Sequence, residues 1–234
     1  MDIQHWPPPY SVRVSLKAKR VQLKISHRDG LVIVIPKRIK KYNIPDLLDE
    51  HKPWIHQHLP VIQEQQRQSL EIPSEIHLRA LNETWKIRRI VTTGPFKVFV
   101  NPNYNLTLLG PEENPKKFQA LLKKWLRKKA QELLPQWLNE TSKRCKLTFE
   151  SLNIRSPKSR WGSCTRNKVI SLNTKLLFIP HELVQHVLIH ELCHTVHLNH
   201  SDQFWQLVAH FDPQWKQHKL ELKRIHTLVP IWME

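Results

Sequence analysis

Residues 181–200, HELVQHVLIHELCHTVHLNH, decide how this chain is expected to fold and act. His190 and His194 are four residues apart, so on a helix their imidazoles project from one face, one turn above the other. Two ring nitrogens placed in this way can reach one zinc ion at about 2.0–2.1 Å each. Glu191 lies beside the two ligands, where a carboxylate can accept a proton from a water molecule. The pattern His-Glu-x-x-His is typical of zinc metalloproteases and predicts that Glu191 is the catalytic base.

The residues around this motif favour metal binding over a chance pairing of histidines. The chain has 15 histidines, so some pairs with a spacing of four arise by chance. The expected helix is largely apolar and therefore buried, because positions 183, 184, 187–189, 192 and 196 are Leu, Val or Ile. Burying two imidazoles and a carboxylate is costly unless they are paired or bind a metal ion. His186 shares the same helix face and is expected to be a structural residue or a support for the ligands.

A catalytic zinc site needs a third protein ligand and leaves a fourth position for water. His200 lies ten residues after His190, which is the offset of the third histidine in the metzincin pattern. Metzincins turn the chain with a glycine where this sequence has His197, but Asn199 tolerates the left-handed conformation that ends a helix. We therefore expect His200 to be the third ligand, with His197 and Glu221 as its rivals.

The composition is that of an ordinary globular protein. The 234 residues are 40% hydrophobic and 24% charged, and no run of about 18 apolar residues predicts a membrane span. The N-terminal segment holds three successive prolines and no apolar signal core, which argues against secretion. Cys145, Cys164 and Cys193 include no C-x-x-C pair, which argues against a disulfide framework and against a cysteine zinc ribbon. We expect the protein in the reducing cytoplasm.

The charge balance is strongly basic. There are 37 Lys and Arg residues against 20 Asp and Glu residues, giving a net charge of +17. Such a field favours nucleic acid, an anionic membrane surface or an acidic partner. One face of a helix expected from residue 115 onward is basic, with Lys116, Lys117, Lys123, Lys124, Arg127 and Lys128. A solvated surface is the first explanation of this face, and a nucleic-acid groove is the second.

The order of elements follows from periodicity and turn residues. Alternating residues on both sides of Asp29-Gly30 predict a hairpin, and residues 43–66 predict two or three short helices broken at Pro53 and Pro60. Four short strands are expected at 74–80, 83–91, 96–101 and 104–109. After a composition shift at Gly110, an amphipathic helix is expected with a kink or break at Pro135. A second hairpin at 160–177 precedes the motif helix, and Ser201 can cap a further helix.

Further stretches make a family resemblance specific. They are RWGSC at 160–164, ISLN at 170–173, HELCH at 190–194, NHS at 199–201 and FW at 204–205. Together they resemble the YgjP-like metallopeptidase family, which is related to the SprT-like and WLM-type zinc peptidases. The similarity extends to KR at 19–20, IPK at 35–37 and WI at 54–55, so it covers most of the chain.

The resemblance implies an α+β protein. A β-rich N-terminal region with inserted helices is expected over residues 1–110, and a zincin-like catalytic domain over residues 111–234. The implied cofactor is Zn²⁺, with the ligands His190, His194 and His200 and with Glu191 as the base. In zincins a sheet edge above the metal pairs with an extended substrate backbone. This role is expected here for Trp161, Gly162, Ser163 and Cys164, and the alternative for Trp161 is a core aromatic residue.

The expected activity is hydrolysis of peptide bonds, and the expected partner is a peptide or protein. Two other classes stay open: a metal-dependent phosphohydrolase acting on nucleotides, and a nucleic-acid-associated protein with a structural zinc. The chain lacks the cysteine-rich zinc ribbon of a full SprT-like protein, which weakens a role directed at DNA. Arg160 and His210 are weak candidates for a residue that stabilises the transition state.

Overall fold

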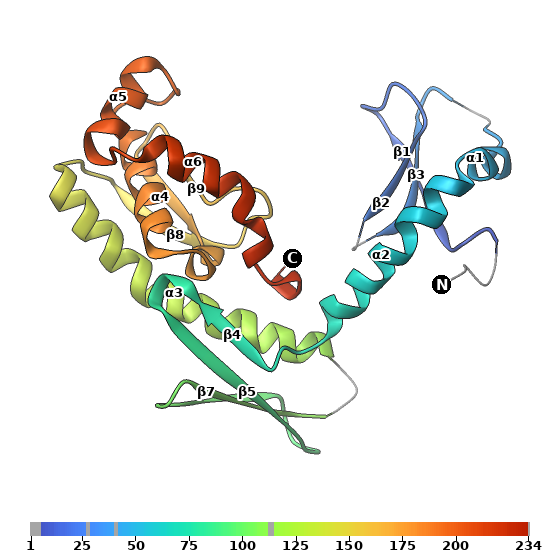
Figure 1. Ribbon diagram of the computed structural model, residues 1–234, viewed down its shortest axis with the longest axis horizontal. Coiled ribbons are helices and arrows are strands. Elements are labelled where there is room, and N and C mark those ends of the chain that lie inside the picture. The colour runs from blue at the N-terminus through green and yellow to red at the C-terminus, as the bar shows by residue number, and fades with distance from the viewer. Residues whose placement is uncertain (1–5, 27–28, 40–41, 112–114, 234) are drawn as a thin grey trace. The chain divides into compact units, whose positions relative to one another are not determined.

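The computed structural model describes residues 6–26, 29–39, 42–111 and 115–233 (Figure 1). The chain forms two compact units, Met1–Glu71 and Ile72–Glu234. Each unit contains both helices and strands, so the protein is of the α+β class, as the sequence predicts.

The first unit contains a three-stranded sheet. β1 (Tyr10–Ser15), β2 (Gln22–Ser26) and β3 (Gly30–Pro36) lie in the order β1-β3-β2. β3 is antiparallel to β2 and parallel to β1. The predicted hairpin is confirmed, and Gly30 has the positive φ of 66° that favours glycine in such a turn.

Two helices complete the first unit, α1 (Ile44–Glu50) and α2 (Lys52–Leu70). Pro53 falls in the first turn of α2, where a backbone N–H has no partner within the helix. Pro60 lies inside α2 and the helix continues through it, so this region forms two helices. The helices close a small apolar core against β3, made of Leu31, Ile33, Leu47, Leu48, Ile55 and Leu59.

The second unit begins with a four-stranded sheet. Its strands are β4 (Glu75–Leu78), β5 (Glu83–Val91), β6 (Lys97–Asn101) and β7 (Asn105–Gly110), in the order β4-β5-β7-β6. The two compact units divide after Glu71, whereas the composition shift in the sequence predicts a boundary after Gly110. The physical reason is that Leu106 and Leu108 of this sheet share one buried core with Phe118 of the following helix.

That following helix, α3 (Pro115–Cys145), runs for 31 residues and continues through Pro135. Its buried side chains recur every three or four residues, as an amphipathic helix requires. Figure 1 shows α3 between the β4–β7 sheet and the elements that carry the histidine motif. Within the described part of the chain, no helix is both long enough and apolar enough to cross a membrane.

A second small sheet and three helices form the rest of the unit. β8 (Ser151–Arg155), β9 (Gly162–Cys164) and β10 (Val169–Asn173) lie in the order β8-β10-β9, so β9 is an edge strand. A 3₁₀ segment, Thr174–Phe178, then leads into α4 (His181–Cys193). α5 (Asp202–Phe211) and α6 (Trp215–Arg224) both contact α4.

Candidate metal centre

α4 carries the histidine motif and is buried along most of its length. The fully buried apolar side chains of this helix are Leu183, Val184, Leu188, Leu192 and Cys193. The helix ends at Cys193, and His194 takes the C-cap position with helical dihedral angles. Because the apolar face is held in the core, His190 and His194 project together from another face.

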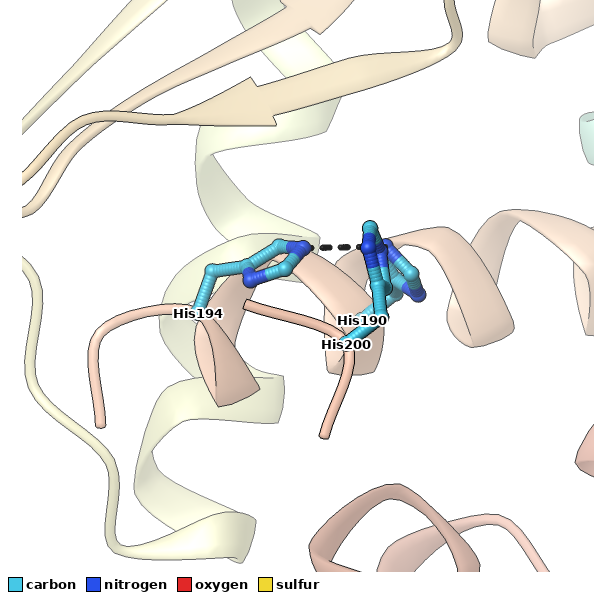
Figure 2. A group of neighbouring side chains, drawn as sticks. All are labelled: His190, His194 and His200. Atoms are coloured by element: carbon cyan, nitrogen blue, oxygen red, sulfur yellow. Dashed lines mark hydrogen bonds between the residues drawn. The ribbon is translucent and has the colours of Figure 1, made fainter. Parts of the chain in front are cut away.

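Three imidazoles converge at the end of α4. The Nε2 atom of His190 lies 3.2 Å from Nε2 of His194 and 3.2 Å from Nε2 of His200. Figure 2 shows the three rings gathered at one point, and one nitrogen from each lies within 4.8 Å of the others. Burial, reinforced by the neighbouring imidazoles, lowers the pKa of His190 to about 3, and burial also lowers the pKa of His194. Neutral rings can offer nitrogen lone pairs to a metal ion.

The orientation of His194 is set by the turn that follows it. Its Nδ1 donates to the backbone carbonyl of His197 at 2.9 Å, since a carbonyl oxygen can only accept. In the neutral ring the proton therefore lies on Nδ1, and Nε2 carries a lone pair that faces His190. A backbone carbonyl that fixes the tautomer of a ligating histidine in this way is common around metals.

His200 reaches the cluster through the turn between α4 and α5. The N–H groups of Val196 and His197 both donate to the carbonyl of Cys193, which reverses the chain after the helix. Asn199, which tolerates the left-handed conformation, does not adopt it here, because it is not among the described residues with positive φ. The Ser201 hydroxyl caps α5 as predicted, accepting from the N–H of Phe204 at 3.4 Å.

The two rival ligands have other partners. His197 contributes its carbonyl to His194, as described above, and its ring is not in the three-histidine group. The Glu221 carboxylate accepts from the side chain of Gln217 at 2.8 Å. Among the described residues, the group that includes His190 is therefore completed by His200.

Glu191 is a buried carboxylate beside this cluster, 5% exposed. Within the described residues its Oε2 atom has no hydrogen-bond partner. Burial raises the pKa of Glu191 to about 8, against the opposing charge of Arg160. Gly162 of β9 lies directly against it, since a Cβ built on Gly162 would be 2.6 Å from Oε1. A raised pKa and an unpartnered oxygen are properties of a catalytic base.

The cluster and the carboxylate open into one cleft with a volume of about 610 Å³. Trp161 and Gly162 line this cleft together with His190, Glu191 and His200. Of the remaining predicted substrate-binding residues, Ser163 lines a separate hollow of about 280 Å³. Cys164 follows on β9, half-buried, and its thiol has a pKa raised to about 11 by burial and by the charge of Glu191.

Comparisons with known proteins decide the family. The model of the family described as "YgjP-like, metallopeptidase domain" matches residues 19–225 of the chain. The chain belongs to this family. A comparison with curated proteins finds no match. Among solved structures, the metallopeptidase zymogen of abylysin from Pyrococcus abyssi is 21% identical with a TM-score of 0.38, over 41% of this chain and 96% of that chain.

In this YgjP-like metallopeptidase, Asn173 holds the segment that leads into β9. Its side-chain amide donates to the carbonyls of Pro157 at 3.0 Å and Arg160 at 2.8 Å. Its side-chain oxygen accepts from the N–H of Lys175 at 3.0 Å. Asn173 is almost fully buried, so these bonds tie the loop before Trp161 to the end of β10.

The metallopeptidase cleft has a wall that the sequence analysis missed. α6 contributes Lys219, Leu222 and Lys223 to it, and α5 contributes Trp205. The Lys219 ammonium lies 3.8 Å from the ring centroid of Trp205, within cation–π distance. The spacing of four between the lysines indicates a shared helix face, but no local pattern indicates that this face borders the cleft.

The two residues considered for transition-state stabilisation, Arg160 and His210, lie outside the lining of the cleft. Arg160 acts on Glu191 through its charge, and its carbonyl accepts from Asn173. His210 is exposed on α5, with its ring against Phe211. Neither is among the residues that line the cleft.

Proposed function

We propose that this YgjP-like metallopeptidase is zinc-dependent and hydrolyses peptide bonds with Glu191 as the general base. The observation that carries the proposal is the convergence of three imidazole nitrogens beside a buried carboxylate with an unpartnered oxygen. The free thiols of the three cysteines agree with a location in the reducing cytoplasm.

The donor set fits zinc. Three neutral imidazoles are a known zinc ligand set, and a catalytic site of this kind leaves a fourth position for water. The Nε2 lone pair of His194 faces the cluster, and the described residues place no carboxylate among the three nitrogens. Zinc bound by His190, His194 and His200 would lower the pKa of water and polarise the scissile carbonyl.

Glu191 supplies the proton transfers. Its buried Oε2 can accept the proton of the attacking water and afterwards deliver it to the leaving amine. A base works best when its pKa is near the working pH, and burial brings Glu191 toward that range. The close contact with Gly162 limits the positions that the carboxylate can take.

The edge strand β9 is the proposed substrate platform. Among the described strands β9 pairs with β10 alone, which leaves its other edge for an added strand. Trp161 and Gly162 border the cleft, so an extended peptide paired with β9 would pass close to Glu191. Ser163 and Cys164 would contribute through their backbone groups.

A structural zinc has less support. Structural zinc sites are closed by four protein ligands, whereas three described residues come together here beside an open cleft. Hydrolysis of nucleotides is the other alternative. The family match supports a peptidase instead.

The test compares two carboxylates of the same helix. Metal-free protein is reconstituted with zinc and assayed on an unbiased peptide library and on a panel of nucleotides. Glu191→Gln should keep zinc and lose about a hundredfold to ten-thousandfold in peptide hydrolysis, because the amide keeps the shape and removes the base. Glu182→Gln changes an exposed residue in the first turn of α4 and should keep full activity.

Two results would contradict the proposal. The first is hydrolysis by Glu191→Gln at the parental rate, which would remove Glu191 from the base role. The second is hydrolysis of nucleotides but not of any peptide in the library.

A further inference from the structure

A second cluster of potential metal ligands includes His186 of α4, whose ring centroid lies 6.2 Å from that of His190. The Oδ2 atom of Asp212 lies 2.6 Å from Nδ1 of His186 and 3.0 Å from Nδ1 of His218. The three side chains are 8%, 3% and 12% exposed in that order. One donor atom from each residue lies within 4.8 Å of the other two.

Three separate elements bring these residues together. His186 is on α4, one turn before His190, so it faces the same general direction as the catalytic motif. Asp212 is the C-cap of α5, and His218 is on α6. Since α5 and α6 both contact α4, the cluster sits where the three helices meet.

The two carboxylate oxygens of Asp212 have different partners. Asp212 Oδ1 accepts from the backbone N–H of Gln214 at 3.2 Å, while Oδ2 faces both imidazoles. Among the described residues, the ion pairs of Asp212 are with His186 and His218. A buried carboxylate requires a compensating positive charge, and a divalent cation held by all three residues would supply it.

We propose that His186, Asp212 and His218 form a second site for a divalent transition-metal ion, separate from the three-histidine centre. Two imidazoles and one carboxylate are a ligand set that binds zinc, iron(II) and related ions and leaves further coordination positions open. These positions face a hollow of about 820 Å³ that all three residues line, so water can complete the coordination.

The second ion would join α4 to the end of α5 and to α6. His218 directly precedes Lys219, and Lys219 and Lys223 of the same helix line the catalytic cleft. An ion at this site therefore holds the wall of the cleft in place. It needs no role in the chemical step.

The test measures the number of metal ions bound per chain in variants that each lack one proposed ligand atom. Asp212→Asn keeps an oxygen for the Gln214 N–H and replaces Oδ2 with an amide nitrogen, which does not ligate. His218→Gln removes an imidazole that is less buried. His210→Gln, an exposed histidine of α5, is the matched control. Each metal-free protein is titrated with Co²⁺ by visible absorption and with zinc by equilibrium dialysis and elemental analysis.

The expected stoichiometry is two ions per chain for the parent and for His210→Gln. Asp212→Asn, His218→Gln and His194→Ala should each bind one ion, and Asp212→Asn combined with His194→Ala should bind none. A parent protein that saturates at one ion, or two ions retained by both Asp212→Asn and His218→Gln, would overturn the second site. Circular dichroism of the metal-free variants checks that the fold is intact.

The outcome is independent of the proposed function. If Glu191→Gln binds two ions and the parent cleaves no peptide, the proposed function fails and the second site stands. If Asp212→Asn and the parent both bind one ion and cleave peptides alike, the second site fails and the proposed function stands.

Discussion

Gly162 of β9 touches the side chain of Glu191 so closely that any Cβ would lie 2.6 Å from Oε1 and 2.7 Å from Cγ. Real Cβ atoms do not approach other atoms at such distances, so the carboxylate would have to move. The pair links the proposed substrate strand to the proposed base.

Gly162→Ala should therefore lower peptide hydrolysis while the zinc content stays unchanged. A displacement of about 1 Å at a reacting group can cost about a hundredfold in rate, and we expect a loss of that order. The matched control is Gly94→Ala, whose Cβ would meet Thr92 Oγ1 at an ordinary 3.6 Å. Full activity in Gly162→Ala would mean that Glu191 does not need its present position.

The raised pKa of Glu191 predicts how the metal-free protein responds to pH. Between its ordinary value of 4.5 and about 8, the folded state keeps a proton that the unfolded state has released. The contribution of Glu191 to the free energy of unfolding should therefore fall as pH rises through this window, by up to about 1.4 kcal/mol per pH unit. Glu191→Gln has no ionisable group at this position and lacks this contribution. The unfolding free energy of the variant minus that of the parent should therefore increase from pH 5 to pH 8. Urea unfolding at both values measures it, and an advantage that does not change with pH would contradict the assignment.

Chelator competition can identify the third ligand of the proposed zinc ion. His200→Ala should weaken zinc binding far more than His197→Ala or Glu221→Ala, because the His200 nitrogen lies in the three-histidine group. His197→Ala keeps the backbone carbonyl that accepts from His194, so its effect should be small. The opposite ranking would assign the third ligand to one of the rivals.

Asn173→Ala should reduce both stability and activity. The variant leaves the carbonyls of Pro157 and Arg160 without their donor, at a cost of about 1–3 kcal/mol in unfolding free energy. The loop before Trp161 should loosen, which raises KM more than it lowers kcat. Asn167→Ala, in the exposed β9–β10 turn, is the control and should change neither quantity. A parental KM in Asn173→Ala would show that the loop does not position substrate.

If the basic face of α3 binds DNA rather than only solvent, the interaction should depend on salt. Lys116, Lys124 and Arg127 are exposed there, whereas Lys123 is half-buried. Reversing Lys116, Lys124 and Arg127 to Glu should weaken binding and flatten the dependence of log affinity on log salt, by about 0.7–0.9 per lost phosphate contact. The same reversal at Lys17, Lys19 and Lys24 controls for net charge. Electrophoretic shifts at two salt concentrations measure the binding. If both triple variants bind DNA equally, the basic face of α3 is only a solvated surface.

Much of the candidate site follows from spacing along one helix. The positions of His190, Glu191 and His194 follow from helical periodicity, and His200 needs only a short turn. The strands β4 to β7 also follow from alternation, and they lie within one or two residues of their predicted bounds, whereas β1 was not predicted.

Contacts between distant segments could not be predicted in this way. The contact of Gly162 with Glu191 depends on the packing of an edge strand against a helix, and the lysines of α6 depend on how that helix returns to α4. The division after Glu71 has the same origin, because the β4–β7 sheet joins α3 in one core that no local pattern reveals.

The position of β9 at the edge of its sheet has a consequence for what the enzyme can select. An edge strand offers N–H and C=O groups, which every polypeptide can pair with if its own backbone groups are free. Segments already paired in a helix or sheet cannot compete for that edge. If β9 binds substrate as proposed, the peptidase would distinguish its targets first by conformation and only then by side chains, cutting unfolded or locally opened chains and leaving folded ones intact.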